Sequence, residues 1–273
     1  MTTGSRDDLY RRYLGILGWV GDPGLHELVS SHLTKVPFEN VSLLCATDPA
    51  TAGTLPSIES FLDGIAEQDL GGTGFPIALH FAELLRYLDY DVELMAADVG
   101  GVPRSHVVLR VKIEDASYFI DVGYAAPFYE PMALDQLPLR VLHGDLTYTI
   151  DRHVSGASTV EVVTYRGNTK VQAYVAKPAA IGPEGFTTGI QRAAAPNARL
   201  QRSLQISRFF ASRVLEVVDN TLITTHHNIT TTTPIQSLED MEVIVREQLQ
   251  LPRVPVRKAV EALRARGIDI FAA

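Results

Sequence analysis

The spacing of apolar residues changes near Val92, and this change constrains the fold more than any other feature of the sequence. Before Val92, apolar residues recur every three or four positions, as in the stripe formed by Leu9, Tyr13 and Leu17. After Val92, short segments rich in β-branched residues are separated by turn residues, a pattern typical of antiparallel strands. Helices followed by strands predict an α+β fold rather than alternating α/β units.

Capping and breaking residues give the expected helix boundaries. Residues 9–34 are expected to be helical, with an interruption at the "GDPG" turn, and Pro37 ends this stretch. Ser57 is expected to cap a short helix that buries an apolar face. Pro76 suits the first position of the next helix, because its missing N–H would be unpaired there in any case.

The second half of the chain is expected to form a sheet or barrel of short strands. Residues 193–203 have no strong pattern and are expected to form a linker or a short helix. A hairpin from residues 208–218 and 221–233 and a helix around residues 237–251 are expected to close the fold. The expected strands of the sheet are 92–99, 105–113, 117–124, 146–154, 159–166 and 171–176.

The composition excludes several classes of protein. A hydrophobic content of 46% and a charged content of 21% are typical of a folded chain. The net charge of −8 and the absence of a Lys/Arg cluster argue against a nucleic-acid partner. No apolar run approaches the roughly 20 residues of a membrane helix, and the N-terminal residues lack the apolar core of a secretion signal. We therefore expect a cytoplasmic protein without a membrane partner.

The stretch "DLGGTGFP", residues 69–76, is the most distinctive local motif. It lacks the Lys-Ser/Thr ending of a phosphate-binding loop, and its glycine spacing differs from the dinucleotide-binding pattern G-x-G-x-x-G. A plain turn before a helix is the simplest interpretation, since glycines mostly serve the backbone.

His106 and Asp121 are the two candidate catalytic residues. His106 begins an apolar strand, and Asp121 lies within "YFIDVGY", where a carboxylate needs a partner. An Asp directed at a His fixes the tautomer of the imidazole and increases its basicity. In a simple hairpin the two residues would share a face but be offset along the strands, so contact is expected to need a bulge or a slipped pairing.

Four motifs in this order resemble the arylamine N-acetyltransferases: "VPFEN" at 36–40, the glycine turn that opens a helix, His106 at a strand start, and "DVG" at 121–123. The resemblance covers nearly the whole chain, through about Leu251. It implies a cysteine-protease-like fold with a helical region (1–88), an antiparallel β-barrel (89–190) and an α/β lid (191–273).

The resemblance also implies an activity. In that family a Cys-His-Asp triad takes an acetyl group from acetyl-CoA and passes it to an arylamine or hydrazine, and related amide synthases close macrolactams. It implies a small-molecule substrate, an acyl-CoA or carrier-protein thioester as donor, an acyl carrier protein as a partner, and no tightly bound cofactor or metal.

This sequence departs from the family motif R-G-G-x-C-F-E at three positions. The nucleophile position is Gly74, the arginine position is Leu70 and the acidic position is Pro76. A mechanism that depends on this cysteine is therefore excluded. Glu39 of "VPFEN" loses its usual arginine partner, and the missing thiol is expected to leave room for substrate beside Gly74.

Three hypotheses follow. The first is a Cys-independent acyltransferase-like enzyme of specialised metabolism, in which the His106–Asp121 dyad acts as general base in amide formation or cyclisation. The second is a non-catalytic protein that binds a ligand or another protein. The third is acetyl transfer through a relocated thiol at Cys45, the only cysteine. The expected substrate-contacting residues are Phe38, Thr73, Gly74, Phe75, Tyr124 and Phe128.

The remaining histidines have simpler interpretations. His80 lies on the apolar stripe of a helix and is expected to be a core residue. His226 and His227 are adjacent in an expected strand, where their side chains would point to opposite faces, and no third metal ligand is evident.

Overall fold

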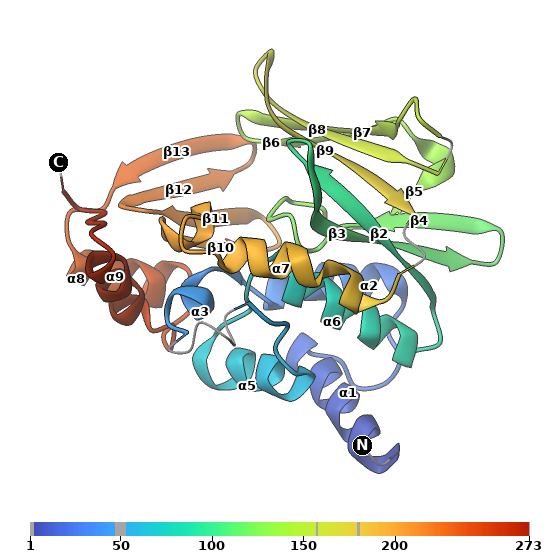
Figure 1. Ribbon diagram of the computed structural model, residues 1–273, viewed down its shortest axis with the longest axis horizontal. Helices are drawn as coiled ribbons and strands as arrows, with labels where there is room; N and C mark the ends of the chain where they lie inside the picture. Colours follow the sequence, from blue (N-terminus) through green and yellow to red (C-terminus); the bar gives the residue numbers. More distant parts are fainter. Residues whose placement is uncertain (1–2, 47–52, 157, 179–180, 273) are drawn as a thin grey trace.

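A computed structural model describes residues 3–46, 53–156, 158–178 and 181–272. The N-terminal helices form one side of the molecule, and a large curved sheet covers them from above (Figure 1). A second sheet and the last helices lie beside them at the C-terminal end. This arrangement confirms the predicted α+β fold.

The N-terminal helices follow the apolar stripes of the sequence. Ser57 caps α5 as expected, since its side chain accepts the N–H of Ser60 at 3.2 Å. The helix before Pro37 ends with Val36 as its C-cap. The buried faces of most of these helices form one core with the nearest strands, whereas Val41 and Leu44 belong to the core at the C-terminal end. The helices are α1 (Thr3–Leu17), α2 (Leu25–Lys35), α3 (Val41–Leu44), α5 (Ile58–Gln68) and α6 (Gly74–Tyr87).

The curved sheet is antiparallel, has eight strands and forms a nearly closed barrel. Its strand order is β5-β4-β3-β2-β9-β8-β7-β6, so neighbours in sequence are mostly neighbours in space. A separate core cluster fills its interior. The strands are β2 (Asp91–Val99), β3 (Val102–Ile113), β4 (Ala116–Ile120), β5 (Met132–Ala133), β6 (Leu139–His143), β7 (Leu146–Arg152), β8 (Val160–Arg166) and β9 (Thr169–Pro178).

The C-terminal part contains a second antiparallel sheet with strand order β1-β10-β11-β12-β13, packed on α8 and α9. Its first strand, β1 (Phe38–Glu39), comes from the N-terminal part of the chain and pairs with β10. The two sheets thus do not correspond simply to consecutive parts of the chain, and the division at residues 88 and 190 stays a prediction. The other elements are α7 (Thr187–Ala194), β10 (Gln205–Phe209), β11 (Arg213–Val218), β12 (Thr221–His226), β13 (Ile229–Pro234), α8 (Leu238–Val243), a π-helical turn (Ile244–Gln248), α9 (Val256–Ala265) and short 3₁₀ turns at Leu134–Gln136, Pro183–Phe186 and Arg199–Gln201.

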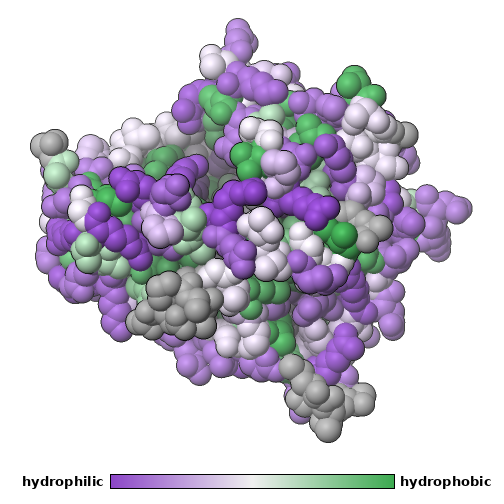
Figure 2. All heavy atoms as spheres, viewed as in Figure 1, coloured by the Kyte–Doolittle hydropathy of each residue, from purple (hydrophilic) through white to green (hydrophobic). Residues whose placement is uncertain are grey.

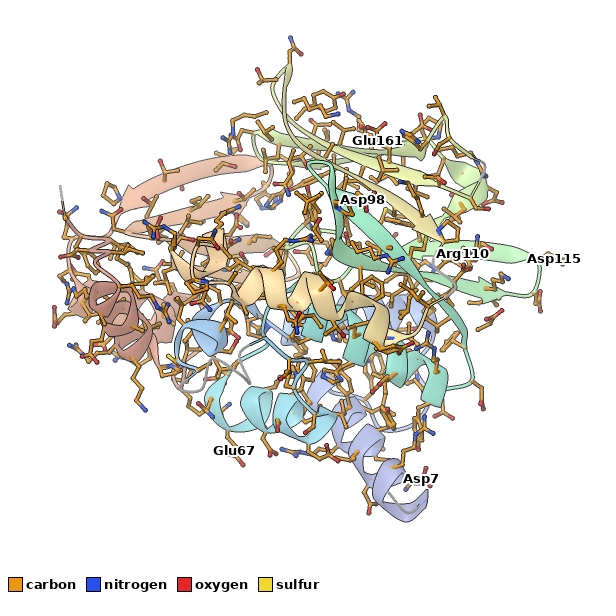
Figure 3. All side chains as sticks on the ribbon, in the orientation of Figure 1. Asp7, Glu67, Asp98, Arg110, Asp115 and Glu161 are labelled. Carbon is orange, nitrogen blue, oxygen red and sulfur yellow. The ribbon has the colours of Figure 1, made fainter. Side chains whose placement is uncertain are left out.

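Charged side chains cover much of the outside of the molecule. The face in Figure 2 is largely hydrophilic, with apolar residues scattered over it. Asp7 and Glu67 point away from the N-terminal helices, and Asp115 lies at the exposed tip of the β3–β4 hairpin (Figure 3). None of the helices in the described ranges has the length and apolar character needed to span a membrane.

Candidate functional site

The structure brings His106 and Asp121 into direct contact. Nε2 of His106 lies 3.0 Å from Oδ1 and 2.9 Å from Oδ2 of Asp121. Both residues are buried, with 6% of His106 and 2% of Asp121 exposed. An imidazole and a carboxylate in this arrangement form the acid–base pair that hydrolases and transferases use to move protons.

The contact forms without a bulge or a slipped register between β3 and β4; the irregularity beside His106 lies in the β2–β3 pairing, between Ala97 and Val99. β3 and β4 pair regularly, with Leu109 opposite Ile120, so His106 and Asp121 are offset as a simple hairpin requires. However, β4 ends at Ile120, and the chain then leaves the sheet. Asp121 is therefore free of the strand geometry and can turn back toward His106.

Two further donors hold the carboxylate of Asp121. The N–H of Gly123 donates to Oδ1 at 3.1 Å, and the hydroxyl of Tyr174 on β9 donates to Oδ2 at 2.6 Å. Burial and the negative charge of Asp121 raise the pKa of Tyr174 well above its ordinary value, which keeps this hydroxyl protonated. These bonds satisfy the buried carboxylate and fix its orientation toward His106.

The other ring nitrogen of His106 faces the glycine turn. Because a carboxylate accepts the Nε2–H, the lone pair of the neutral ring is assigned to Nδ1. Nδ1 lies 3.4 Å from the position that a Cβ atom on Gly74 would take. Within the described part of the chain, no hydrogen bond to Nδ1 is present, so this nitrogen is available to accept a proton.

The free space expected beside Gly74 is absent at the position where a side chain on this residue would begin. A Cβ on Gly74 would lie 2.6 Å from the carbonyl oxygen of Gly123, and a Cβ on Gly123 would lie 2.7 Å from the carbonyl oxygen of Gly74. Because neither residue has a side chain, the two backbones approach closely. The space in which the family carries its thiol is filled by the backbone at Gly123.

The first turn of α6 leaves backbone donors beside His106. Thr73 is the N-cap residue, but its side chain makes no capping hydrogen bond. In the ranges that the structure covers, the N–H groups of Gly74 and Phe75 have no acceptor, and Pro76 has no N–H. Unpaired N–H groups at a helix N-terminus favour negative charge. They can stabilise an oxyanion that forms near them.

Glu39 keeps partners although the family arginine is replaced by Leu70. Its Oε1 accepts the N–H of Gly72 at 2.6 Å, and its Oε2 accepts the N–H of Ser42 at 2.8 Å. Backbone N–H groups therefore hold the carboxylate that the arginine would hold in the family motif. Burial raises the pKa of this carboxyl.

Among the expected substrate-contacting residues, Tyr124 lies at the dyad. Its ring centroid is 5.7 Å from that of His106 and 4.9 Å from that of Tyr174. Phe128 is buried inside the barrel and packs edge-on against Tyr148 at 5.3 Å. Sequence reasoning missed Tyr174, because nothing in "VQAYVA" distinguishes its hydroxyl from those of other strand tyrosines.

In the described ranges, no hydrogen bond or ring contact joins the side chains of the other three expected contact residues to the imidazole. Phe75 is buried and packs near Phe186 at 6.0 Å. Phe38 is half-buried in β1 and packs against the helical core. Thr73 and Phe75 line a cavity beside the glycine turn, and neither His106 nor Asp121 is among the described residues that line it.

Cys45 follows α3 and packs against the C-terminal core. Its sulfur lies 4.0 Å from the carbonyl oxygen of Pro255. Burial and the negative charge of Glu39 raise the pKa of this thiol, so the structure does not activate it as a nucleophile.

Two histidine expectations have different outcomes. His80 is a buried core residue, as predicted, with Nε2 3.0 Å from the carbonyl oxygen of Pro56. The prediction that His226 and His227 point to opposite faces is wrong. β12 ends at His226 and His227 lies in the turn, so their rings lie 3.9 Å apart. No metal-binding group of three or more suitable side chains is present among residues with described positions.

Comparison with known families identifies the class of protein. An N-acetyltransferase family model matches residues 23–256, well over half of the chain. The chain therefore belongs to the arylamine N-acetyltransferase family, and the predicted fold is confirmed.

Individual relatives add detail. The chain is 28% identical over 177 residues to proansamycin X synthase from Amycolatopsis mediterranei (strain S699). That match covers 58% of this chain and 66% of the relative, just under two thirds of its length.

Solved structures of arylamine N-acetyltransferases share the fold, and two of them serve as examples. The arylamine N-acetyltransferase from Salmonella typhimurium has a TM-score of 0.78 and 17% identity, and the match covers 97% of this chain and 99% of that one. The Nocardia farcinica enzyme has a TM-score of 0.77 and 23% identity, covering 96% and 94% of the two chains. At these identities the likeness establishes the fold alone.

Proposed function

We propose that this protein is an acyltransferase that forms amides without a cysteine nucleophile, with His106 as general base. The observation that carries the proposal is the His106–Asp121 contact beside a nucleophile position occupied by Gly74. A buried polar pair of this kind is costly to maintain when it serves no purpose, which favours a retained chemical role.

The proposed reaction is direct attack of an amine on a thioester. Nδ1 of His106 takes the proton that the amine loses as the new C–N bond forms, and Asp121 stabilises the resulting imidazolium. The oxyanion of the tetrahedral intermediate accepts hydrogen bonds from the N–H groups of Gly74 and Phe75. The C–S bond then breaks, and the leaving thiolate takes the proton from His106.

Members of the family use acyl-CoA as a substrate. For this chain we propose a thioester of CoA or of an acyl carrier protein as donor. When the amine and the thioester belong to one molecule, the same step closes a lactam, which the similarity to an amide synthase supports. Such a reaction belongs to specialised metabolism.

Substrate access requires a local movement. Only 6% of His106 is exposed, and the carbonyl of Gly123 fills the Cβ side of Gly74. We propose that substrate binding displaces the chain that follows Asp121, which contains Gly123 and Tyr124. This movement would open Nδ1 to the amine without breaking the His106–Asp121 contact.

The direct test is replacement of the base. His106→Asn is expected to lower thiol release from an acetyl thioester in the presence of aniline by about 100-fold or more. His26 is exposed, so His26→Asn is the matched control and should leave the rate unchanged. Acetyl-CoA and acetyl-N-acetylcysteamine serve as donors. An unchanged rate in His106→Asn would refute the proposal.

A non-catalytic binding role is the second candidate, and the close Gly74–Gly123 contact favours it. In that case the wild-type protein would release no thiol above the rate without protein, with either donor. The dyad would then serve only to hold the loop after β4 against the barrel.

A further inference from the structure

β13 (Ile229–Pro234) is the last strand of the second sheet, and only one of its sides is paired, with β12. Figure 1 shows it along the outside of that sheet. Five of its six residues are exposed. An edge strand of this kind presents unpaired backbone N–H and C=O groups, to which another strand can bind.

The pairing with β12 shows which backbone groups of β13 point outward. Directly after β13, Ile235 donates its N–H to the carbonyl oxygen of Asn220 at 2.7 Å, and the regular register continues from there along both strands. Because the backbone groups of successive residues alternate in direction, those of Thr230 and Thr232 point away from β12. Within the described ranges, neither residue has a backbone hydrogen bond to any other segment.

Both ends of this free stretch are defined by the backbone. Pro234 is the next residue that faces outward, and it has no N–H to donate. Before the strand, Asn228 lies in the turn with a φ of 60°, which is outside the extended range of a strand. The free edge therefore consists of Thr230 and Thr232, with Thr231 between them.

The other edges of the two sheets are less suited to pairing with a further strand. Among the described strands, β1 and β5 are edge strands of two residues each. β6 is longer, but it carries Arg140, and a charge on an edge strand discourages pairing. β13 has no charged residue, and four of its residues are threonines, which favour strands. An uncharged strand can lie against an identical copy without like charges facing each other.

We propose that β13 pairs with β13 of a second copy of this chain, antiparallel and about a two-fold axis at Thr231. Thr230 of each copy then lies opposite Thr232 of the other, and each of these pairs exchanges two backbone hydrogen bonds. A shift of the register by two residues brings Pro234 or Asn228 into the pairing and loses hydrogen bonds. The backbone therefore specifies one register, in which every free group of the edge has a partner.

Threonine side chains support this pairing. Within the β12–β13 hairpin, Oγ1 of Thr225 already lies 3.1 Å from Oγ1 of Thr230 on the opposite strand. Cross-strand pairs of threonines stabilise antiparallel sheets through such contacts. At the proposed axis, Thr231 of one copy lies opposite Thr231 of the other, so the interface repeats a contact that the hairpin itself uses. The dimer would join the second sheets of two copies into one continuous sheet.

Sedimentation velocity over an about 100-fold range of protein concentration tests the dimer. Thr232→Pro removes an N–H that points away from β12, so it should leave the fold intact but weaken dimerisation by about tenfold or more. Thr232→Val keeps this N–H and is the matched control. A wild-type protein that stays monomeric throughout would overturn the proposal and leave the edge to a strand of a different protein. Equal dimerisation of Thr232→Pro and Thr232→Val would overturn the assigned location.

Disulfide cross-linking tests the register, and it decides the location even if Thr232→Pro fails to fold. In a Cys45→Ala background, Thr231→Cys should form a linked dimer on oxidation, because the register places the two Cα atoms about 4.5 Å apart. Thr233→Cys is the control, since in this register it lies opposite Ile229 of the other copy and should not link. Linking of both variants, or of neither, would contradict the register. These readouts are independent of thiol release and of the role proposed for His106.

Discussion

Two buried histidines in this protein have very different surroundings. His106 lies at the barrel with the carboxylate of Asp121 at 2.9 Å. His32 lies in the helical core, where Nε2 is 2.8 Å from the hydroxyl of Tyr13 and the ring is 4.4 Å from that of Phe81. Nδ1 of His32 is buried and has no hydrogen-bond partner in the described residues.

Burial lowers the pKa of His32 to about 3. With no carboxylate beside it, this ring stays neutral, contacts the Tyr13 hydroxyl and packs in the core. The comparison shows that burial by itself makes a histidine a core residue. A buried histidine can accept a proton from a substrate only when a partner such as Asp121 stabilises the charge that results.

The largest expected effect comes from making the partner of His106 neutral. Asp121→Asn removes the negative charge and is expected to reduce thiol release by about 100-fold or more. Asp115, at the exposed tip of the same hairpin, gives the control Asp115→Asn. A rate for Asp121→Asn within about threefold of wild type would show that the carboxylate does not support the base.

The second prediction concerns acid stability and His32. The unfolded chain binds a proton at His32 below about pH 6.5, whereas the folded chain binds it only near pH 3. This contribution to stability is therefore full above pH 6.5 and is lost as the pH falls toward 3. At pH 4.5 the loss from this group is about 2–3 kcal/mol.

Urea unfolding at pH 7 and pH 4.5 measures this effect. The double variant Tyr13→Phe/His32→Leu removes the ionisable ring together with its hydroxyl partner. It should lose less free energy of unfolding on acidification than the wild-type protein. Equal losses in the two proteins would mean that His32 does not control acid stability.

The third prediction compares Gly74, in the glycine turn, with Gly64, in the preceding helix α5. Gly74→Ala places a Cβ 2.6 Å from the carbonyl of Gly123 and should destabilise the fold by about 1–3 kcal/mol. Gly64→Ala, inside α5, makes only ordinary contacts and should stabilise by about 0.5–1 kcal/mol. Thermal unfolding distinguishes them, and the opposite order would contradict the close backbone contact beside His106.

The smallest effect is expected from the tyrosine that holds Asp121. Tyr174→Phe removes one hydrogen bond and should cost about 1 kcal/mol of stability. The rate of thiol release should fall only a few-fold, since the contact between His106 and Asp121 remains. Tyr165→Phe, on the neighbouring strand, is the control. A loss as large as that of Asp121→Asn would make Tyr174 part of the acid–base machinery.

The sequence predicts the fold well where local signals agree. The cap at Ser57, the break before Pro37 and the strand alternation after Val92 all correspond to observed elements. The prediction that residues 208–218 and 221–233 form one hairpin is wrong, because these segments contain parts of four strands, β10 to β13. The short elements α3, β5, β6 and α7 were not predicted, and neither were β1 and α9. β1 has only two residues and exists through its pairing with β10, and α9 begins directly after Pro255, where a run of prolines and arginines hides its apolar stripe.

The candidate site was predictable in its residues but less so in its geometry. An isolated His and Asp in apolar strands indicate a polar pair, and the structure places them together. Neither the strand end at Ile120 nor the approach of Gly123 to Gly74 follows from local pattern, because both depend on tertiary packing. The cavity beside Leu70 likewise requires four separate segments to meet.

The central claim is that acyl transfer proceeds here without a covalent intermediate on the protein. Intact mass spectrometry during turnover of acetyl-N-acetylcysteamine with aniline tests it most directly, on the wild-type protein and on Cys45→Ala. The account predicts amide product from both proteins and no protein species heavier by one acetyl group. An acetylated protein that appears in the wild type, and disappears together with turnover in Cys45→Ala, would contradict it.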